Sequence, residues 1–167
     1  MTAKIEQLAD YFQTLIGSKK EIELGEITPL LIKRYALAVG ESNPLYFEKE
    51  IAQQYGYEDI IAPPNLLASV IEWDVGLDEE YLHLDGMPKQ GFLPERFNGI
   101  KIMGGGEKKE FFSPLVAGMN VKLISQITDT YTRSGSKGLI AFLEETNTYQ
   151  DENENILCVS KRTTMAR

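Results

Sequence analysis

The side chains best suited to chemistry lie in one short loop, Gly40-Glu41-Ser42-Asn43-Pro44-Leu45-Tyr46. Glu41 and Tyr46 are the two groups in it that can exchange a proton. A general acid or base works best with a pKa near the working pH. A phenol titrates near ~10 and an imidazole near ~6.5, so Tyr46 cannot simply act as a histidine would. Taken alone, the loop indicates either an active-site region around Glu41 or a solvated carboxylate beside an anchoring aromatic ring.

Asn43 and Pro44 separate these two groups. Asn and Pro favour turns, because the Asn side chain bonds to nearby backbone and the Pro ring fixes φ. The pair therefore predicts a tight turn that sets the directions of the side chains on either side of it.

A second segment, Ile60-Ile61-Ala62-Pro63-Pro64-Asn65-Leu66, leads into an apolar stretch. Residues 65–75 leave little polar face, and a helix that is apolar nearly all round is buried. Proline starts a helix well but carries no N–H. The segment thus predicts a long buried helix from Asn65 to Val75. Pro64, directly before it, leaves the start of this helix without one backbone N–H donor.

The remaining patterns predict the elements that position these segments. Apolar spacing favours a helix over 4–16, alternation favours a strand over 20–27, and Thr28-Pro29 is a capped start for a helix that stops at Gly40. Residues 77–98 are polar and predict a surface insertion or lid. The last third of the chain predicts β structure. Its strands are expected around 121–127, over 139–149 and, with alternating burial, from Ile156. A bulge is expected at 104–106, a turn at 133–138 and a hairpin loop at 151–155.

Composition and net charge exclude several classes of protein for this chain. The chain of 167 residues fits one domain, 1–167, and is 43% hydrophobic and 25% charged. Its net charge of -8 argues against nucleic acid and anionic membranes as partners. A single cysteine, one histidine and the absence of ligand spacing predict no disulfide and no metal site. With no apolar signal segment or membrane span, we expect a cytoplasmic protein.

In order and spacing these motifs resemble the MaoC-like hydratases and dehydratases of acyl thioesters, over roughly residues 15–167. The loop of that family reads Gly-Asp-x-Asn-Pro-aliphatic-His, so Glu41 stands at the Asp position and Tyr46 at the His position. Segments 104–107, 114–118 and 162–164 resemble one branch of it, the N-terminal dehydratase-type domain, which is related to the dehydratase region of fungal fatty acid synthase.

The resemblance implies an α+β hot-dog fold, in which an antiparallel β-sheet wraps around a long buried helix. It implies catalytic positions at Glu41 and Tyr46. Substrate contacts are implied at five positions: Asn43, Pro44, Tyr46, Pro64 and Asn65. Catalytic members carry Gly at the position of Pro64, and its N–H points at the thioester carbonyl, where it stabilises developing charge.

The implied function is that of a subunit in an acyl-thioester hydratase or dehydratase of fatty acid metabolism, acting on a coenzyme A or phosphopantetheine thioester without a cofactor. Because Glu41, Tyr46 and Pro64 depart from the catalytic pattern, we expect the acyl-binding half of a dimer with an Asp/His-bearing MaoC-like partner. Two alternatives stay open. One is a self-sufficient homodimeric hydratase or thioesterase that uses Glu41, and the other is a non-enzymatic acyl-CoA-binding protein.

Overall fold

Five antiparallel strands form one sheet in the order β1-β3-β4-β5-β2. The strands are β1 (Lys19–Glu26), β2 (Ile102–Phe111), β3 (Asn120–Gly135), β4 (Gly138–Asp151) and β5 (Ile156–Ala166). The computed structural model describes residues 2–67, 78–82, 84, 93–136 and 138–167. Sheet and helices together confirm the predicted α+β class.

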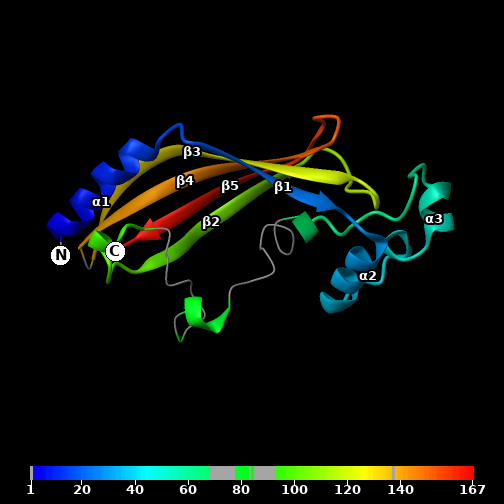
Figure 1. Cartoon of the computed structure of the whole chain (residues 1–167), viewed down its shortest axis with the longest axis horizontal. Helices are drawn as coiled ribbons and strands as arrows, with labels where there is room; N and C mark the ends of the chain where they lie inside the picture. Colours follow the sequence, from blue (N-terminus) through cyan, green and yellow to red (C-terminus); the bar gives the residue numbers. More distant parts are fainter. Residues whose placement is uncertain (1, 68–77, 83, 85–92, 137) are drawn as a thin grey trace.

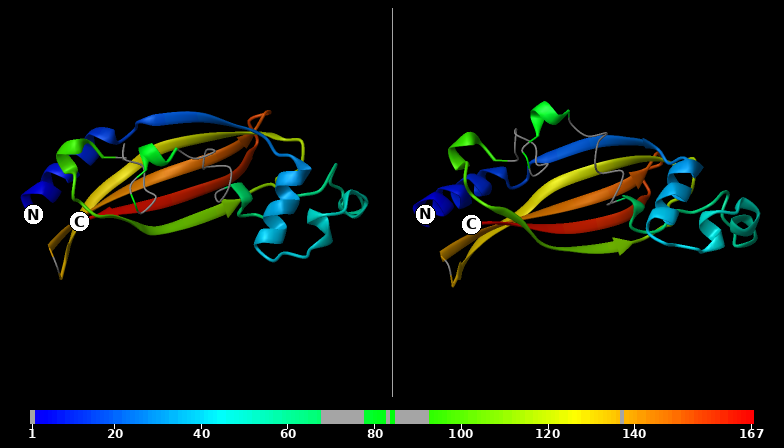
Figure 2. Two further views of the ribbon diagram at one scale, coloured as in Figure 1. Left: turned by 60° about the horizontal axis from the view of Figure 1, so that its bottom comes forward. Right: turned by 90° about the horizontal axis from the view of Figure 1, so that it is seen from below.

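Helices lie at both ends of this sheet (Figure 1). At one end is α1 (Thr2–Leu15), close to the C-terminus of the chain, and at the other are α2 (Pro29–Ala38) and α3 (Lys49–Gln54). Three short 3-10 helices complete the described elements: η1 (Pro44–Tyr46), η3 (Glu79–Tyr81) and η4 (Glu95–Phe97). The two views of Figure 2 show β1 at one margin of the sheet and β2 at the other.

The helix before the chemical loop forms as its sequence predicts. Thr28 Oγ1 accepts a hydrogen bond from Leu31 N at 3.3 Å, and Pro29 occupies the first helical position. At the other end Gly40 has a φ of 77°, and Glu41 N donates to Ala36 O at 2.8 Å. A left-handed glycine is a common helix stop, so the start and the end of α2 both follow from local sequence.

The buried apolar residues form two clusters. The first joins Ile60, Ala62, Leu66 and Leu67 to residues of β3, β4 and β5. The second holds the apolar face of α1 against the sheet: Ile5, Leu8, Phe12, Phe97, Ile127, Ala141, Leu143 and Ala166. Residue Phe97, within the segment 77–98, is 2% exposed, so this part of the predicted insertion is packed into the second cluster. Residues 77, 83 and 85–92 of that segment lie outside the described residues.

The predicted buried helix from Asn65 to Val75 also lies largely outside the described residues. Leu66 and Leu67 are helical, both are buried, and both belong to the first cluster. Leu66 N donates to Pro63 O at 3.0 Å. The described part of this segment is therefore an apolar turn that follows the two prolines.

Two β predictions need correction. The turn predicted at 133–138 is shorter, because β3 continues to Gly135 and pairs there with Gly138. The alternation predicted for the final strand fails at its start: Leu157 and Cys158 are both buried, next to a register shift opposite Tyr149 and Gln150. A register shift puts two successive side chains where a regular strand would put one.

The bulge predicted at 104–106 is confirmed. The pairing of β2 with β5 shifts register between Gly104 and Gly106. Gly106 has a φ of 134°, and a Cβ on Gly105 would lie 3.0 Å from side-chain atoms of Thr163 and Met165. Glycine is thus required here both for the backbone conformation and for the close approach of β5.

Candidate functional site

A pocket of about 330 Å³ lies where the loop after α2, the Ile61–Leu67 segment and the end of β2 meet. Its described lining is mostly apolar: Tyr46, Ile61, Ala62, Pro64, Leu67, Phe111, Phe112, Ser113, Pro114 and Leu115. The side-chain hydroxyls of Tyr46 and Ser113 are the polar groups of this lining. Ligand pockets are typically apolar with a few placed polar groups, and this volume is near the small end of their range.

Backbone hydrogen bonds hold the three pocket-forming segments together. Ile61 N donates to Leu45 O at 3.0 Å, which joins the second segment to the chemical loop. Ala62 N donates to Leu115 O at 2.8 Å, which joins the same segment to the chain after β2. The pocket walls are therefore fixed by main-chain contacts between parts of the chain that are far apart in sequence.

The Asn43-Pro44 turn forms as predicted. Asn43 Oδ1 accepts from Leu45 N at 3.1 Å, and Pro44 opens η1. Tyr46 N donates to Asn43 O at 3.0 Å. The turn places Tyr46 in the pocket wall although neither Asn43 nor Pro44 belongs to the described lining.

The six predicted site residues thus divide into two groups. Tyr46 and Pro64 come together in the pocket lining. Glu41 is exposed at the helix end, and the described lining does not include it. Asn65 is likewise outside that lining, where its Oδ1 accepts from Lys109 Nζ at 3.3 Å.

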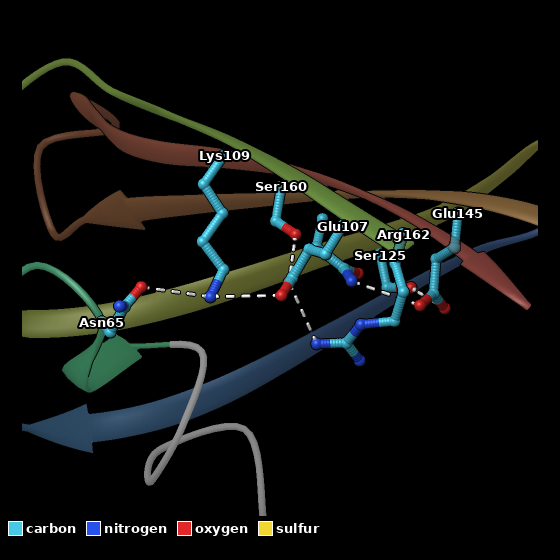
Figure 3. Close-up of polar contacts among 8 residues, drawn as sticks. Asn65, Glu107, Lys109, Ser125, Glu145, Ser160 and Arg162 are labelled. Carbon is cyan, nitrogen blue, oxygen red and sulfur yellow. Dashed lines mark hydrogen bonds and ion pairs between the residues drawn. The ribbon is translucent and has the colours of Figure 1, made fainter. Parts of the chain in front are cut away.

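That contact leads into a polar cluster that the sequence patterns did not reveal (Figure 3). Glu107 is its centre. One carboxylate oxygen accepts from Ser160 Oγ at 2.6 Å and lies 3.3 Å from Arg162 Nη2, and the other lies 3.2 Å from Lys109 Nζ. In the sequence these residues belong to two separate polar runs, 107–110 and 160–164, and neither run indicates that the two pair.

Burial and neighbouring charge act in opposite directions on Glu107. Burial raises the pKa of its carboxyl, but the hydrogen bonds from Ser160 and Lys109 and the charges of Lys109 and Arg162 outweigh burial, so the pKa lies below its usual range. Glu107 is therefore a carboxylate at neutral pH, and it acts as an acceptor rather than as a proton donor.

A second carboxylate extends the cluster across the sheet. Glu145 accepts from Ser125 Oγ at 2.7 Å and from Asn147 Nδ2 at 3.2 Å. Asn147 is 1% exposed and Ser160 is 0% exposed. Asn147 and Ser160 are consequently part of the interior of the protein and not of a solvated surface.

Cys158 adjoins both the pocket and the polar cluster. It is 1% exposed and belongs to the first apolar cluster. Burial raises the pKa of its thiol, while the charges of Lys109 and Glu107 act on it in opposite directions. A buried thiol with a raised pKa is a poor nucleophile. In the described ranges no three His, Cys, Asp or Glu side chains gather as a metal-binding group.

The family description "FAS1-like, dehydratase domain region" matches residues 14–159. The chain belongs to this family of FAS1-like dehydratase regions. Among curated proteins it is similar to a UPF0336 protein of Saccharopolyspora erythraea, 27% identical over 138 residues that cover 81% of this chain and 78% of that protein. A UPF0336 protein of Parafrankia sp. is 27% identical over 119 residues, 70% of each chain.

Solved structures show the same fold. The chain resembles the ChsH1-ChsH2 complex from Mycobacterium tuberculosis with a TM-score of 0.66 and 17% identity, over 99% of this chain and 92% of that one. It resembles HadBC, a 3R-hydroxyacyl-ACP dehydratase complex of the same organism, with a TM-score of 0.63 and 17% identity, over 90% and 96%. It also resembles the (R)-hydratase from A. caviae, with a TM-score of 0.59 and 18% identity, over 89% of this chain and 94% of that one.

These likenesses confirm the resemblance to the MaoC-like proteins and the hot-dog fold that it implied. None of the helices in the described ranges combines the length and the apolar character that crossing a bilayer demands.

Proposed function

We propose that this protein is the acyl-binding subunit of an acyl-thioester hydratase or dehydratase. The reaction is the reversible addition of water across the C2–C3 double bond of a 2-enoyl thioester, giving a 3-hydroxyacyl thioester. The observation that carries the proposal is the pocket lined by both Tyr46 and Pro64. The binding site is present, while the two lining positions where the family's chemistry needs an imidazole and an N–H hold a phenol and a proline.

The pocket suits an acyl chain. Its described lining is apolar apart from two hydroxyls, and each methylene moved from water to such a lining stabilises the complex by about 0.8 kcal/mol. The proposed reaction makes the substrate a thioester of coenzyme A or of a phosphopantetheine-bearing carrier protein, and the apolar lining would receive its acyl chain. Neither requires a further cofactor for water addition.

The chemistry is incomplete in this chain. Tyr46 places a phenol hydroxyl in the pocket where the family's chemistry needs an imidazole. Pro64 offers no N–H to a carbonyl oxygen, and losing such a donor typically lowers the rate by ~10²–10³. Glu41 lies at an exposed helix end outside the described lining. We therefore assign the Asp/His pair to a second subunit.

Two features support a partner of the same fold. Phe111 and Phe112 belong to the pocket lining, yet they are 48% and 59% exposed at the end of an edge strand. Exposed apolar groups and open sheet edges favour association. Two of the similar solved structures are complexes of named chains, ChsH1-ChsH2 and HadBC. A second hot-dog unit against this rim would cover the aromatic rings and supply the missing catalytic groups.

The proposal is tested with crotonyl-CoA as substrate and with calorimetry as a separate measure of binding. The chain alone should bind acyl-CoA but hydrate crotonyl-CoA poorly or not at all, and addition of an Asp/His-bearing hot-dog partner should restore turnover. Robust turnover by the chain alone that Glu41→Gln abolishes would establish instead a self-sufficient homodimer. Binding that stays without turnover in the presence of every such partner would establish a non-enzymatic acyl-CoA-binding protein.

A further inference from the structure

Three successive rows of side chains cross the sheet beside the pocket. Cross-strand partners share a face, so register defines each row. The first row is apolar and includes the pocket residue Phe111, paired in turn with Cys158, Tyr149 and Leu123. The second row is polar: Lys109, Ser160, Asn147 and Ser125. The third row carries three charges: Glu107, Arg162 and Glu145.

The polar rows begin directly where the pocket wall ends. Residues two apart on a strand share a face and lie about 7 Å apart, so Lys109 is one such step from Phe111. Lys109 also donates to Asn65, the residue after the pocket residue Pro64. The Lys109 ammonium group thus lies next to both the Phe111 wall and the Pro64 wall of the pocket. Beyond the charged row, the face is apolar again, but α1 covers it.

The charges in these rows are held in place. Glu107 accepts from Ser160 at 2.6 Å and pairs with Lys109 and Arg162, and Ser125 and Asn147 both donate to Glu145. The side chains of Lys109, Glu107 and Arg162 are 17%, 29% and 30% exposed. These side chains are still partly hydrated. An acyl chain that covered them would therefore have to displace water from paired ions.

We propose that these two rows are a polar barrier that ends the acyl pocket and restricts the ligand to short acyl chains. This inference rests on the proposed acyl-thioester function and adds its substrate class. Within the apolar row each further buried methylene raises affinity about fourfold. Past that row the chain would cover charged groups, and the cost of desolvating ions offsets the gain from several methylenes. Affinity should therefore stop rising at a chain that reaches Lys109.

The test measures binding of saturated acyl-CoA thioesters, which have no double bond to hydrate. We expect the dissociation constant to fall from butyryl- to hexanoyl-CoA and to stop falling at octanoyl-CoA, with dodecanoyl- and palmitoyl-CoA no tighter. Affinity that keeps rising through palmitoyl-CoA would overturn the barrier and leave the proposed function standing. Absence of binding at every length, with and without a catalytic partner, would instead overturn the proposed function.

A variant identifies the barrier itself. Glu107→Leu, Lys109→Met, Glu145→Gln and Arg162→Met together remove two charges of each sign and leave the net charge unchanged. In the folded variant we expect dodecanoyl-CoA to bind at least about tenfold tighter than to the wild type. The matched control is Lys108→Met with Glu110→Leu, which removes an ion pair of 2.9 Å from the opposite face of the same strand. It should leave the length profile unchanged.

Equal dodecanoyl-CoA affinity in the folded variant and the wild type would contradict the assignment. Near-ultraviolet circular dichroism establishes whether the variant has folded. If it has not, the length profile of the wild type decides the question alone.

Discussion

Ser160 on β5 donates a hydrogen bond of 2.6 Å to Glu107 on β2, and the hydroxyl side chain is 0% exposed. The bond joins the edge strand to the interior of the sheet at the polar rows beside the pocket. Glu107 also forms ion pairs with Lys109 and Arg162. One ionised carboxylate therefore contacts three side chains. Its protonation should affect the stability of the whole region.

The first prediction concerns acid stability. The pKa of Glu107 is lowered in the folded protein, because hydrogen bonds and neighbouring cations outweigh its burial. A lowered pKa contributes stability that is fully present above the unfolded-state pKa and is lost as pH falls through the folded pKa. Glu107→Gln should therefore reduce the free energy of unfolding by about 1–3 kcal/mol at neutral pH, and the difference should shrink in acid. Urea unfolding from neutral pH down to pH ~3 measures it.

The control for this prediction is Glu110→Gln on the same strand, whose partner Lys108 is on the surface. Surface ion pairs contribute little, so its effect should be much smaller at every pH. A Glu107→Gln difference that stays constant across the titration would contradict the linkage.

The second prediction concerns the β4–β5 hairpin. Asp151 Oδ1 accepts from Asn153 N at 2.9 Å and Asn155 N at 2.8 Å, and Oδ2 accepts from Asn155 Nδ2 at 2.9 Å. Asp151→Ala leaves these donors without their acceptor and should destabilise by about 1–3 kcal/mol. For a chain of this length that lowers Tm by roughly 2–4 °C for each kcal/mol.

Calorimetric scans of Asp151→Ala and Asn153→Ala provide the comparison. The second variant keeps the backbone N–H that Asp151 binds, so its Tm should stay close to that of the wild type. Equal losses in the two variants would show that the hairpin depends on something other than the Asp151 carboxylate.

The third prediction concerns the missing chemistry. Glu41→Asp, Tyr46→His and Pro64→Gly together should give weak but measurable hydration of crotonyl-CoA, because catalytic groups that act as a unit are strongly non-additive. Each substitution alone should give none. Histidine restores a group that titrates near neutrality, and glycine restores an N–H at the pocket wall. A misplacement of ~1 Å costs about 10²-fold, so the activity should remain low.

Initial rates of the triple variant, the three single variants and the wild type give the answer. Inert behaviour of a triple variant that folds and still binds acyl-CoA would mean that these three exchanges are not a sufficient account of the lost activity.

The fourth prediction concerns assembly. We expect the chain to be at least a dimer, because exposed aromatic rings stand at the end of an edge strand. Phe112→Asp should weaken self-association by about tenfold or more, since it places a charge in an apolar interface. The control is Tyr55→Asp at the C-terminal end of α3, where Tyr55 is 70% exposed. Sedimentation equilibrium that gives the mass of one chain for the wild type would refute this prediction.

Short-range sequence features are sufficient to predict several local elements. Thr28, Pro29 and Gly40 define both ends of α2 through a cap, a fixed φ and a left-handed stop. Asn43 and Pro44 define the turn that carries Tyr46. These outcomes depend on groups a few residues apart, so the physics that fixes them is contained in a short window of sequence.

Which residues share a site depends on the folded arrangement of distant segments. This arrangement placed Tyr46 and Pro64 in one pocket with Phe111, left Glu41 outside the described lining, and assembled the polar rows. Alternation tells which residues of a strand share a face, but it does not tell which residue of another strand stands opposite. That register depends on bulges such as the one between Gly104 and Gly106. The pairing of Glu107 with Arg162 and Ser160 is therefore a property of the folded sheet and of no single segment.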